Sequence, residues 1–154
     1  MKKLSTILCC LFGIFQVAAQ WNPTNVFTIT NDGIYDLINY NGTLFASVNT
    51  DGFVKSTDNG NTWSIVGQTG FTTNPNSLRV SNIASTSSSI YTVTFNASDA
   101  ASIIYKSIDN GQTFTQDIAG LPTFGSGVET VNNLYAHNDY LIATFNGGNY
   151  IKFD

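Results

Sequence analysis

The chain has 154 residues, a formal net charge of −4 and only 10% charged residues. Six Lys and Arg residues are too few to neutralise the phosphates of a nucleic acid, which excludes nucleic-acid binding as the function. Aromatic residues make up 13% of the chain, and this proportion excludes a disordered protein.

Residues 1–19 have the three parts of a secretory signal peptide. Two lysines form the basic start, an apolar run covers 4–17, and Val17 and Ala19 occupy the −3 and −1 positions before the expected cleavage site. The apolar run is shorter than the roughly 20 residues of a membrane-spanning helix. Neither cysteine follows the small residue that lipoprotein processing requires. We therefore expect a secreted, extracellular or cell-surface protein.

The mature chain, 20–154, is long enough for one domain and has no transmembrane segment. Both cysteines leave with the signal peptide, so the mature chain has no disulfide and no thiol chemistry. Its four cations stand against ten acidic residues, a formal charge of −6.

Short runs of alternating apolar and polar residues follow, separated by clusters of Asn, Gly, Asp and Ser, and this pattern predicts strands and turns. The first run, 21–30, is predicted to be an outer, fourth strand that is not preceded by the first three strands of its own group. The Asn41-Gly42 pair is the strongest hairpin signal. The other predicted strands fall into three groups: 34–40, 44–49, 53–56 and 62–67; then 80–85, 91–96, 103–107 and 113–118; then 131–136, 141–146 and 150–152. The second strands, LFASVN, YTVTFN and LIATFN, align as versions of one strand that ends in Asn.

The third and fourth strands of the first two groups are joined by nearly identical segments. STDNGNTW covers 56–63 and SIDNGQTF covers 107–114, so that Asp58 and Asp109 are 51 residues apart. A repeat of about this length, built from four antiparallel strands, is typical of the blades of a β-propeller. The sequence therefore predicts an all-β, incomplete propeller of about two to three blades.

Both segments resemble the Asp-box of the bacterial neuraminidase repeat family, S-x-D-x-G-x-T-[WF], and the resemblance covers nearly all of the mature chain. It implies that the boxes are folding devices on the face opposite the ligand site. The aspartates accept hydrogen bonds from turn N–H groups, the glycines adopt positive φ, and the aromatic rings are buried against the neighbouring sheet. A calcium loop is excluded, because glycine and tryptophan stand where its ligands and its turn would be. The box residues are Ser56, Asp58, Gly60, Trp63, Ser107, Asp109, Gly111 and Phe114.

If the boxes lie on one face, the loops between second and third strands and between blades lie on the other, where function concentrates. We expect weak ligand-binding candidates there and no catalytic residue, metal or cofactor. The strand-ending asparagines can equally bond their own turns. The candidates are Asn49, Asp51, Phe71, Arg79, Asn96, Asp99, Glu129, Asn146 and Asn149.

A complete neuraminidase site is absent from this sequence. The resemblance implies three arginines and a glutamate-activated tyrosine, and the mature chain has one arginine and one glutamate. Glucan-cleaving relatives use a carboxylate pair, to which Asp32 and Glu129 could contribute. The favoured interpretation is a secreted, non-catalytic binding or scaffold module for a carbohydrate or protein at the cell surface. The alternative is the N-terminal part of an extracellular glycoside hydrolase, sialidase- or xyloglucanase-like.

The last predicted strand ends just before a third box would begin. Propellers usually have 4–8 blades, so we expect either a fragment of a longer protein or several copies that assemble to close the ring.

Overall fold

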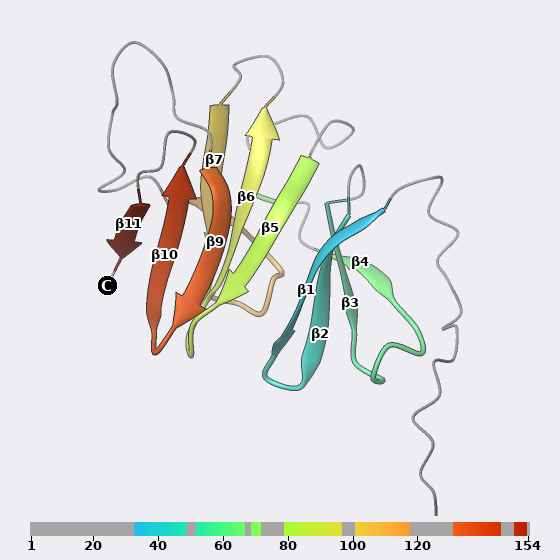
Figure 1. The fold of residues 1–154 in the computed structure, drawn as a ribbon. Coiled ribbons are helices and arrows are strands. Elements are labelled where there is room, and N and C mark those ends of the chain that lie inside the picture. The colour runs from blue at the N-terminus through green and yellow to red at the C-terminus, as the bar shows by residue number, and fades with distance from the viewer. Residues whose placement is uncertain are drawn as a thin grey trace, which may run out of the picture.

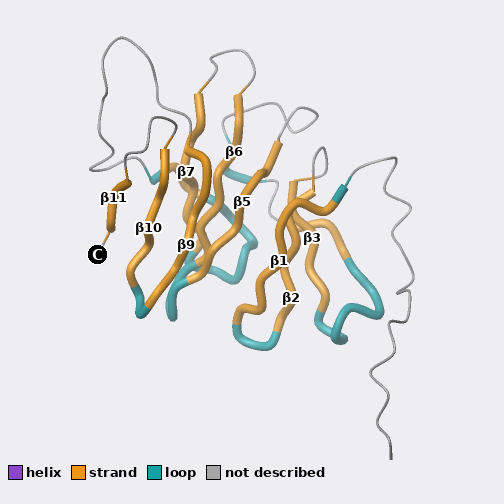
Figure 2. Tube along the Cα trace, in the orientation of Figure 1, coloured by secondary structure: helices purple, strands orange, loops and turns teal. Residues whose placement is uncertain are grey.

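The computed structural model describes residues 33–48, 52–66, 69–71, 79–96, 101–117, 131–145 and 150–153, and these form three antiparallel sheets (Figures 1 and 2). Sheet 1 contains β1 (Ile34–Tyr40), β2 (Thr43–Val48), β3 (Gly52–Ser56) and β4 (Ser64–Val66). Sheet 2 contains β5 (Arg79–Ser85), β6 (Ile90–Asn96), β7 (Ala101–Ser107) and β8 (Thr115–Gln116). Sheet 3 contains β9 (Val131–His137), β10 (Tyr140–Phe145) and β11 (Tyr150–Phe153).

Each sheet is a meander in which neighbours in sequence are neighbours in space. The eleven strands coincide with the eleven predicted in the three groups, with ends that differ by at most two residues on either side. The all-β prediction is confirmed. The predicted outer strand, 21–30, lies outside the described residues.

The hairpins follow the turn chemistry of their sequences. Asn41 and Gly42 both have positive φ, 51° and 79°, as the predicted two-residue turn between β1 and β2 requires. Asn138 and Asp139, at 47° and 66°, make the same kind of turn between β9 and β10. Residues 86–89 instead form a four-residue turn, in which Thr86 donates its N–H to the Ser89 carbonyl at 3.0 Å.

The first strand of every sheet has a bulge near its start, at the second residue of β1 and β9 and at the third residue of β5. The pairing register skips Tyr35 in β1, Ser81 in β5 and Asn132 in β9. A bulge adds one unpaired residue and sharpens the local twist. The repeated bulge therefore sets the same bend into the first strand of all three sheets.

Pairing after the bulge corrects the predicted alignment of the second strands. In each first strand, the residue four positions after the bulged residue marks the same place in the sheet. Its partners in the second strands of sheets 1, 2 and 3 are Leu44, Ile90 and Leu141. The sequence alignment had placed Tyr91 at this position of sheet 2 and was wrong by one residue. Both faces of β6 are buried, so apolar alternation does not indicate which face one of its residues occupies.

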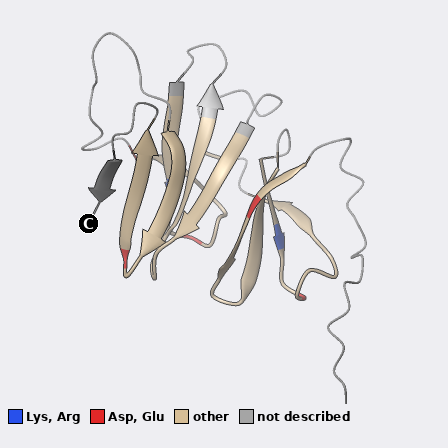
Figure 3. Ribbon diagram, viewed as in Figure 1, with Lys and Arg blue, Asp and Glu red and all other residues tan. Residues whose placement is uncertain are grey.

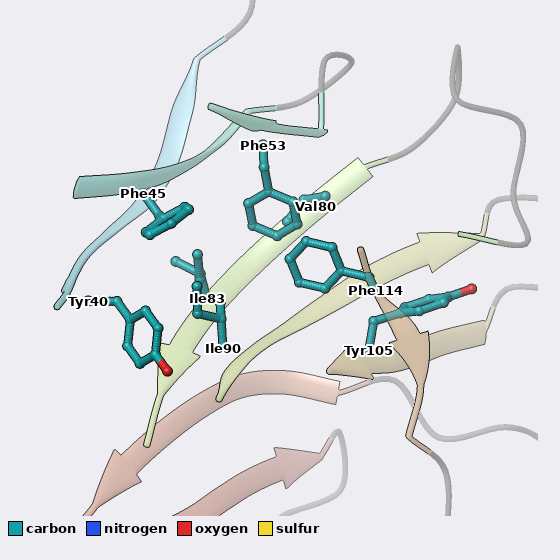
Figure 4. Packing of buried hydrophobic residues seen from close by; sticks show 8 residues of the cluster. All are labelled: Tyr40, Phe45, Phe53, Val80, Ile83, Ile90, Tyr105 and Phe114. Carbon is teal, nitrogen blue, oxygen red and sulfur yellow. The ribbon is translucent and has the colours of Figure 1, made fainter. Parts of the chain in front are cut away.

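The three sheets pack face to face through two apolar clusters. The first joins sheets 1 and 2, and its rings interleave between them (Figure 4): Phe114 lies 4.9 Å from Phe53, centroid to centroid, with the ring planes 8° apart. Phe71 stacks on Phe114 at 5.0 Å. The second cluster joins sheets 2 and 3 through aliphatic side chains such as Ile104 and Leu134.

Gly70 lies where the link between sheets 1 and 2 passes the backbone of Phe114. Phe114 donates its N–H to the Thr69 carbonyl at 3.0 Å, and a Cβ added to Gly70 would lie 1.7 Å from the Phe114 carbonyl oxygen. Gly70 also has a φ of 97°. Only glycine satisfies both constraints.

We expect Gly70→Ala to destabilise the fold severely, because the backbone at Phe114, directly before β8, must move away from the link. Gly42→Ala is the matched control, since Gly42 also has positive φ but nothing within 4 Å of its added Cβ. The control should cost about 1–2 kcal/mol, the usual penalty of a left-handed residue, and Gly70→Ala clearly more in the same denaturant titration. Equal losses would contradict the close approach.

Candidate functional site

The turn between β3 and β4 is organised by two side chains. Asp58 accepts hydrogen bonds from the Thr62 hydroxyl at 2.6 Å and the Thr62 N–H at 2.8 Å. The Ser56 hydroxyl donates to Asp58 at 2.7 Å and accepts from the Gly60 N–H at 2.8 Å. Gly60 has a φ of 89°. The side chains thus take up turn N–H groups that no strand ladder pairs.

The turn between β7 and β8 repeats this network almost distance for distance. Asp109 accepts from the hydroxyl and the N–H of Thr113 at 2.5 and 2.9 Å, and Ser107 accepts from the Gly111 N–H at 2.9 Å. The residue before each glycine, Asn59 or Asn110, also has positive φ. That second left-handed position is a feature the sequence reasoning missed, although asparagine before glycine is its usual signal.

The hydrogen bonds of these turns lower the pKa of both aspartates from the ordinary 3.8 to about 2. The first cause is the threonine hydroxyl, Thr62 for Asp58 and Thr113 for Asp109, followed by the N–H of the same threonine. Donors aimed at a carboxylate favour its ionised form.

The aromatic residues that end the two turns have different surroundings. Phe114 is buried between sheets 1 and 2, and Gly111 beside it would place a Cβ 2.9 Å from the Phe45 ring of sheet 1. Trp63 packs on Ala46, Val48 and Val54 of its own sheet, is only partly buried, and donates its indole N–H to the Gly60 carbonyl at 3.1 Å. Burial against a neighbouring sheet was expected of both rings; the structure shows it for Phe114 and places Trp63 over its own sheet.

Most of the predicted loop candidates cannot be placed in the site. Phe71 contacts Phe53, Phe114 and Tyr105 in the core between sheets 1 and 2. Arg79 begins β5 and Asn96 ends β6, and their side chains lie outside the described part. Outside the described residues altogether are Asn49, Asp51, Asp99, Glu129, Asn146 and Asn149, and also Asp32.

A groove of about 590 Å³ lies instead along the first strands of all three sheets. Its walls are segments of β1, β5 and β9, each of which is an edge strand of its sheet. Tyr35 and Tyr135 expose their rings there. Asp36 is the one carboxylate among the described lining residues, which include no Lys or Arg. Charged residues are sparse over the described strands as a whole (Figure 3).

Three equivalent residues form a polar row along this groove: Asp36, Asn82 and Asn133, each directly after a bulge. Asp36 of sheet 1 accepts the Ile83 N–H of sheet 2 at 3.2 Å. The side-chain amide N–H of Asn82 in sheet 2 donates to the side-chain amide oxygen of Asn133 in sheet 3 at 3.1 Å. Because β5 pairs on one side only, its outward N–H groups need such partners.

The sequence reasoning missed this row, but a signal for it exists. The first strands read IYDLI, VSNIA and VNNLY, and all three have Asp or Asn at the third position and Leu or Ile at the fourth. Aligning first strands in place of boxes would have identified Asp36, Asn82 and Asn133 as one repeated position.

Two further findings concern the described part of the chain. It contains no cluster of three or more His, Cys, Asp or Glu residues able to hold a metal ion. It also has no helix long and apolar enough to cross a membrane.

Comparisons with known proteins identify the fold. No family model and no curated protein matches the chain. Among solved structures, YCF48 from Cyanidioschyzon merolae superposes with a TM-score of 0.56 at 14% identity. The three sheets are blades of a β-propeller. The match covers 80% of this chain but 40% of the YCF48 chain, so this chain spans less than half the length of that relative.

We call the β3–β4 and β7–β8 turns, which contain Asp58 and Asp109, the aspartate turns. Their lowered pKa values lead us to expect a specific loss of stability in acid. Since the folded-state pKa of about 2 lies below the ordinary 3.8, ionised Asp58 and Asp109 stabilise the fold above about pH 4, and this contribution is lost as the pH falls toward 2. Asp109→Asn removes one titrating group while keeping a carbonyl acceptor. We expect a lower melting temperature at neutral pH and a shallower decline between pH 4 and 2 than in the wild type.

The control is Asp117→Asn, because Asp117 lies outside both turns. It should leave the slope of melting temperature against pH unchanged. If the melting temperature of Asp109→Asn falls between pH 4 and 2 as steeply as that of the wild type, the turn does not stabilise the ionised form of Asp109.

Proposed function

We propose that the chain is a secreted, non-catalytic β-propeller binding module whose ligand surface is the groove along β1, β5 and β9. The observation that carries the proposal is the convergence of all three sheets on one concave, polar surface with exposed tyrosines. Ligand sites combine such a concavity with a few placed polar groups.

The lining favours an uncharged, polyhydroxylated ligand. Asparagine amides and a carboxylate exchange hydrogen bonds with hydroxyl groups, and the exposed Tyr35 ring can stack on the apolar face of a sugar ring. The described lining offers a carboxylated sugar no cation, and Asp36 would repel it. A neutral glycan is therefore the proposed ligand.

The two aspartate turns have a structural role in this proposal and do not contact the ligand. Their networks are satisfied within each turn, and Phe114 fills the space between sheets. We propose that they are Asp-boxes that stabilise the blades and take no part in binding, as the motif resemblance implies.

The test is a glycan array followed by titration calorimetry with a neutral hit such as a xyloglucan oligosaccharide. Tyr35→Ala should weaken binding roughly two- to tenfold, the effect of losing one stacking contact, without changing the melting temperature. Tyr140→Ala, which removes an exposed tyrosine outside the groove, should bind as the wild type does.

Binding of sialyl-lactose in preference to neutral glycans would contradict the charge argument. Hydrolysis of either probe by the wild-type chain would replace the binding module with a glycoside hydrolase.

A further inference from the structure

Two equivalent apolar positions in the first strand of each sheet are buried in sheets 2 and 3 but exposed in sheet 1. Val80 and Ile83 of sheet 2 are 1% and 3% exposed, and Val131 and Leu134 of sheet 3 are 4% exposed each. Their equivalents in sheet 1, Ile34 and Leu37, are 56% and 51% exposed. In every sheet these are the apolar residue directly before the bulge and the apolar residue directly after the polar row.

The neighbouring sheet explains the burial in sheets 2 and 3. We call the face that carries these residues the leading face, and the opposite one the trailing face. The leading face of sheet 2 packs on the trailing face of sheet 1, where Phe45 is buried and Ile38 partly buried. The leading face of sheet 3 packs in the same way on sheet 2, on Ala84 and Val93.

The trailing face of sheet 3 exposes the counterparts of those covering residues. By strand register, Tyr135 is equivalent to Ile38 and Ala84, and it is 61% exposed. It pairs with Ile142, the equivalent of Phe45, which is only partly buried. The chain thus presents both halves of an interface that it already makes twice internally.

We propose that two copies of this chain associate head to tail, the leading face of sheet 1 of each copy packing on the trailing face of sheet 3 of the other. The contact is heterologous, and with two copies it closes, because three sheets from each give six around one axis, within the usual 4–8 blades. Closure buries Ile34, Leu37 and Tyr135 and surrounds the groove with six first strands. The proposal rests on these exposed residues and not on the identity of the ligand.

Size-exclusion chromatography with light scattering on the full chain tests it. The wild type should have twice the mass of a single chain at micromolar concentration. Leu37→Asp and Tyr135→Asp each place a charge in the interface and should raise the dimer dissociation constant about tenfold or more. Ile108→Asp is the matched control, since Ile108 is 79% exposed in the β7–β8 turn, and it should remain dimeric. Circular dichroism should show all three variants folded.

Mixing the two interface variants separates this arrangement from other dimers. A mixed pair of Leu37→Asp and Tyr135→Asp has both charges in one interface and none in the other. The mixture should therefore dimerise more strongly than either variant alone. A monomeric wild type, a dimer insensitive to Tyr135→Asp, or a mixture that dimerises no better than the single variants would each overturn the proposal.

Discussion

Face-to-face packing of thin sheets is the constraint on which the rest of this structure depends. Each sheet has apolar side chains on both faces and cannot shield either from water by itself. Phe114 shows how the chain meets the constraint: its ring lies between its own sheet and Phe53 of the preceding one. Burying such a ring contributes roughly 1.5–3 kcal/mol, and the link between the two sheets passes directly against the backbone of Phe114 at Gly70.

The aspartate turns serve that packing. A β-turn leaves N–H groups without ladder partners, and an unpaired group beside an apolar interface is costly. Asp109 and Ser107 satisfy those groups inside the turn, which leaves Gly111 free to approach Phe45 of the neighbouring sheet. The β3–β4 turn has the same internal network, although its aromatic residue, Trp63, packs over its own sheet.

The strands could be predicted from the sequence, and the candidate site could not. Alternation and turn residues are local signals, and they located every described strand. The one-residue error in sheet 2 arose because both faces of β6 are buried, so its Thr and Val residues fit either register. Phe71 was predicted on a ligand loop, although its ring lies in the core. A lone aromatic residue near glycine does not reveal which neighbour covers it.

The groove was missed for a different physical reason. Its residues do not cluster in sequence, since Asp36, Asn82 and Asn133 come from three sheets and meet only when the first strands line one axis. Each also joins two sheets: Asp36 accepts an outward backbone N–H of an edge strand, and Asn82 and Asn133 bond each other across the next boundary. The same side chains that join the sheets therefore give the groove its polarity, and this is the surface to which we propose that a hydroxyl-rich ligand binds.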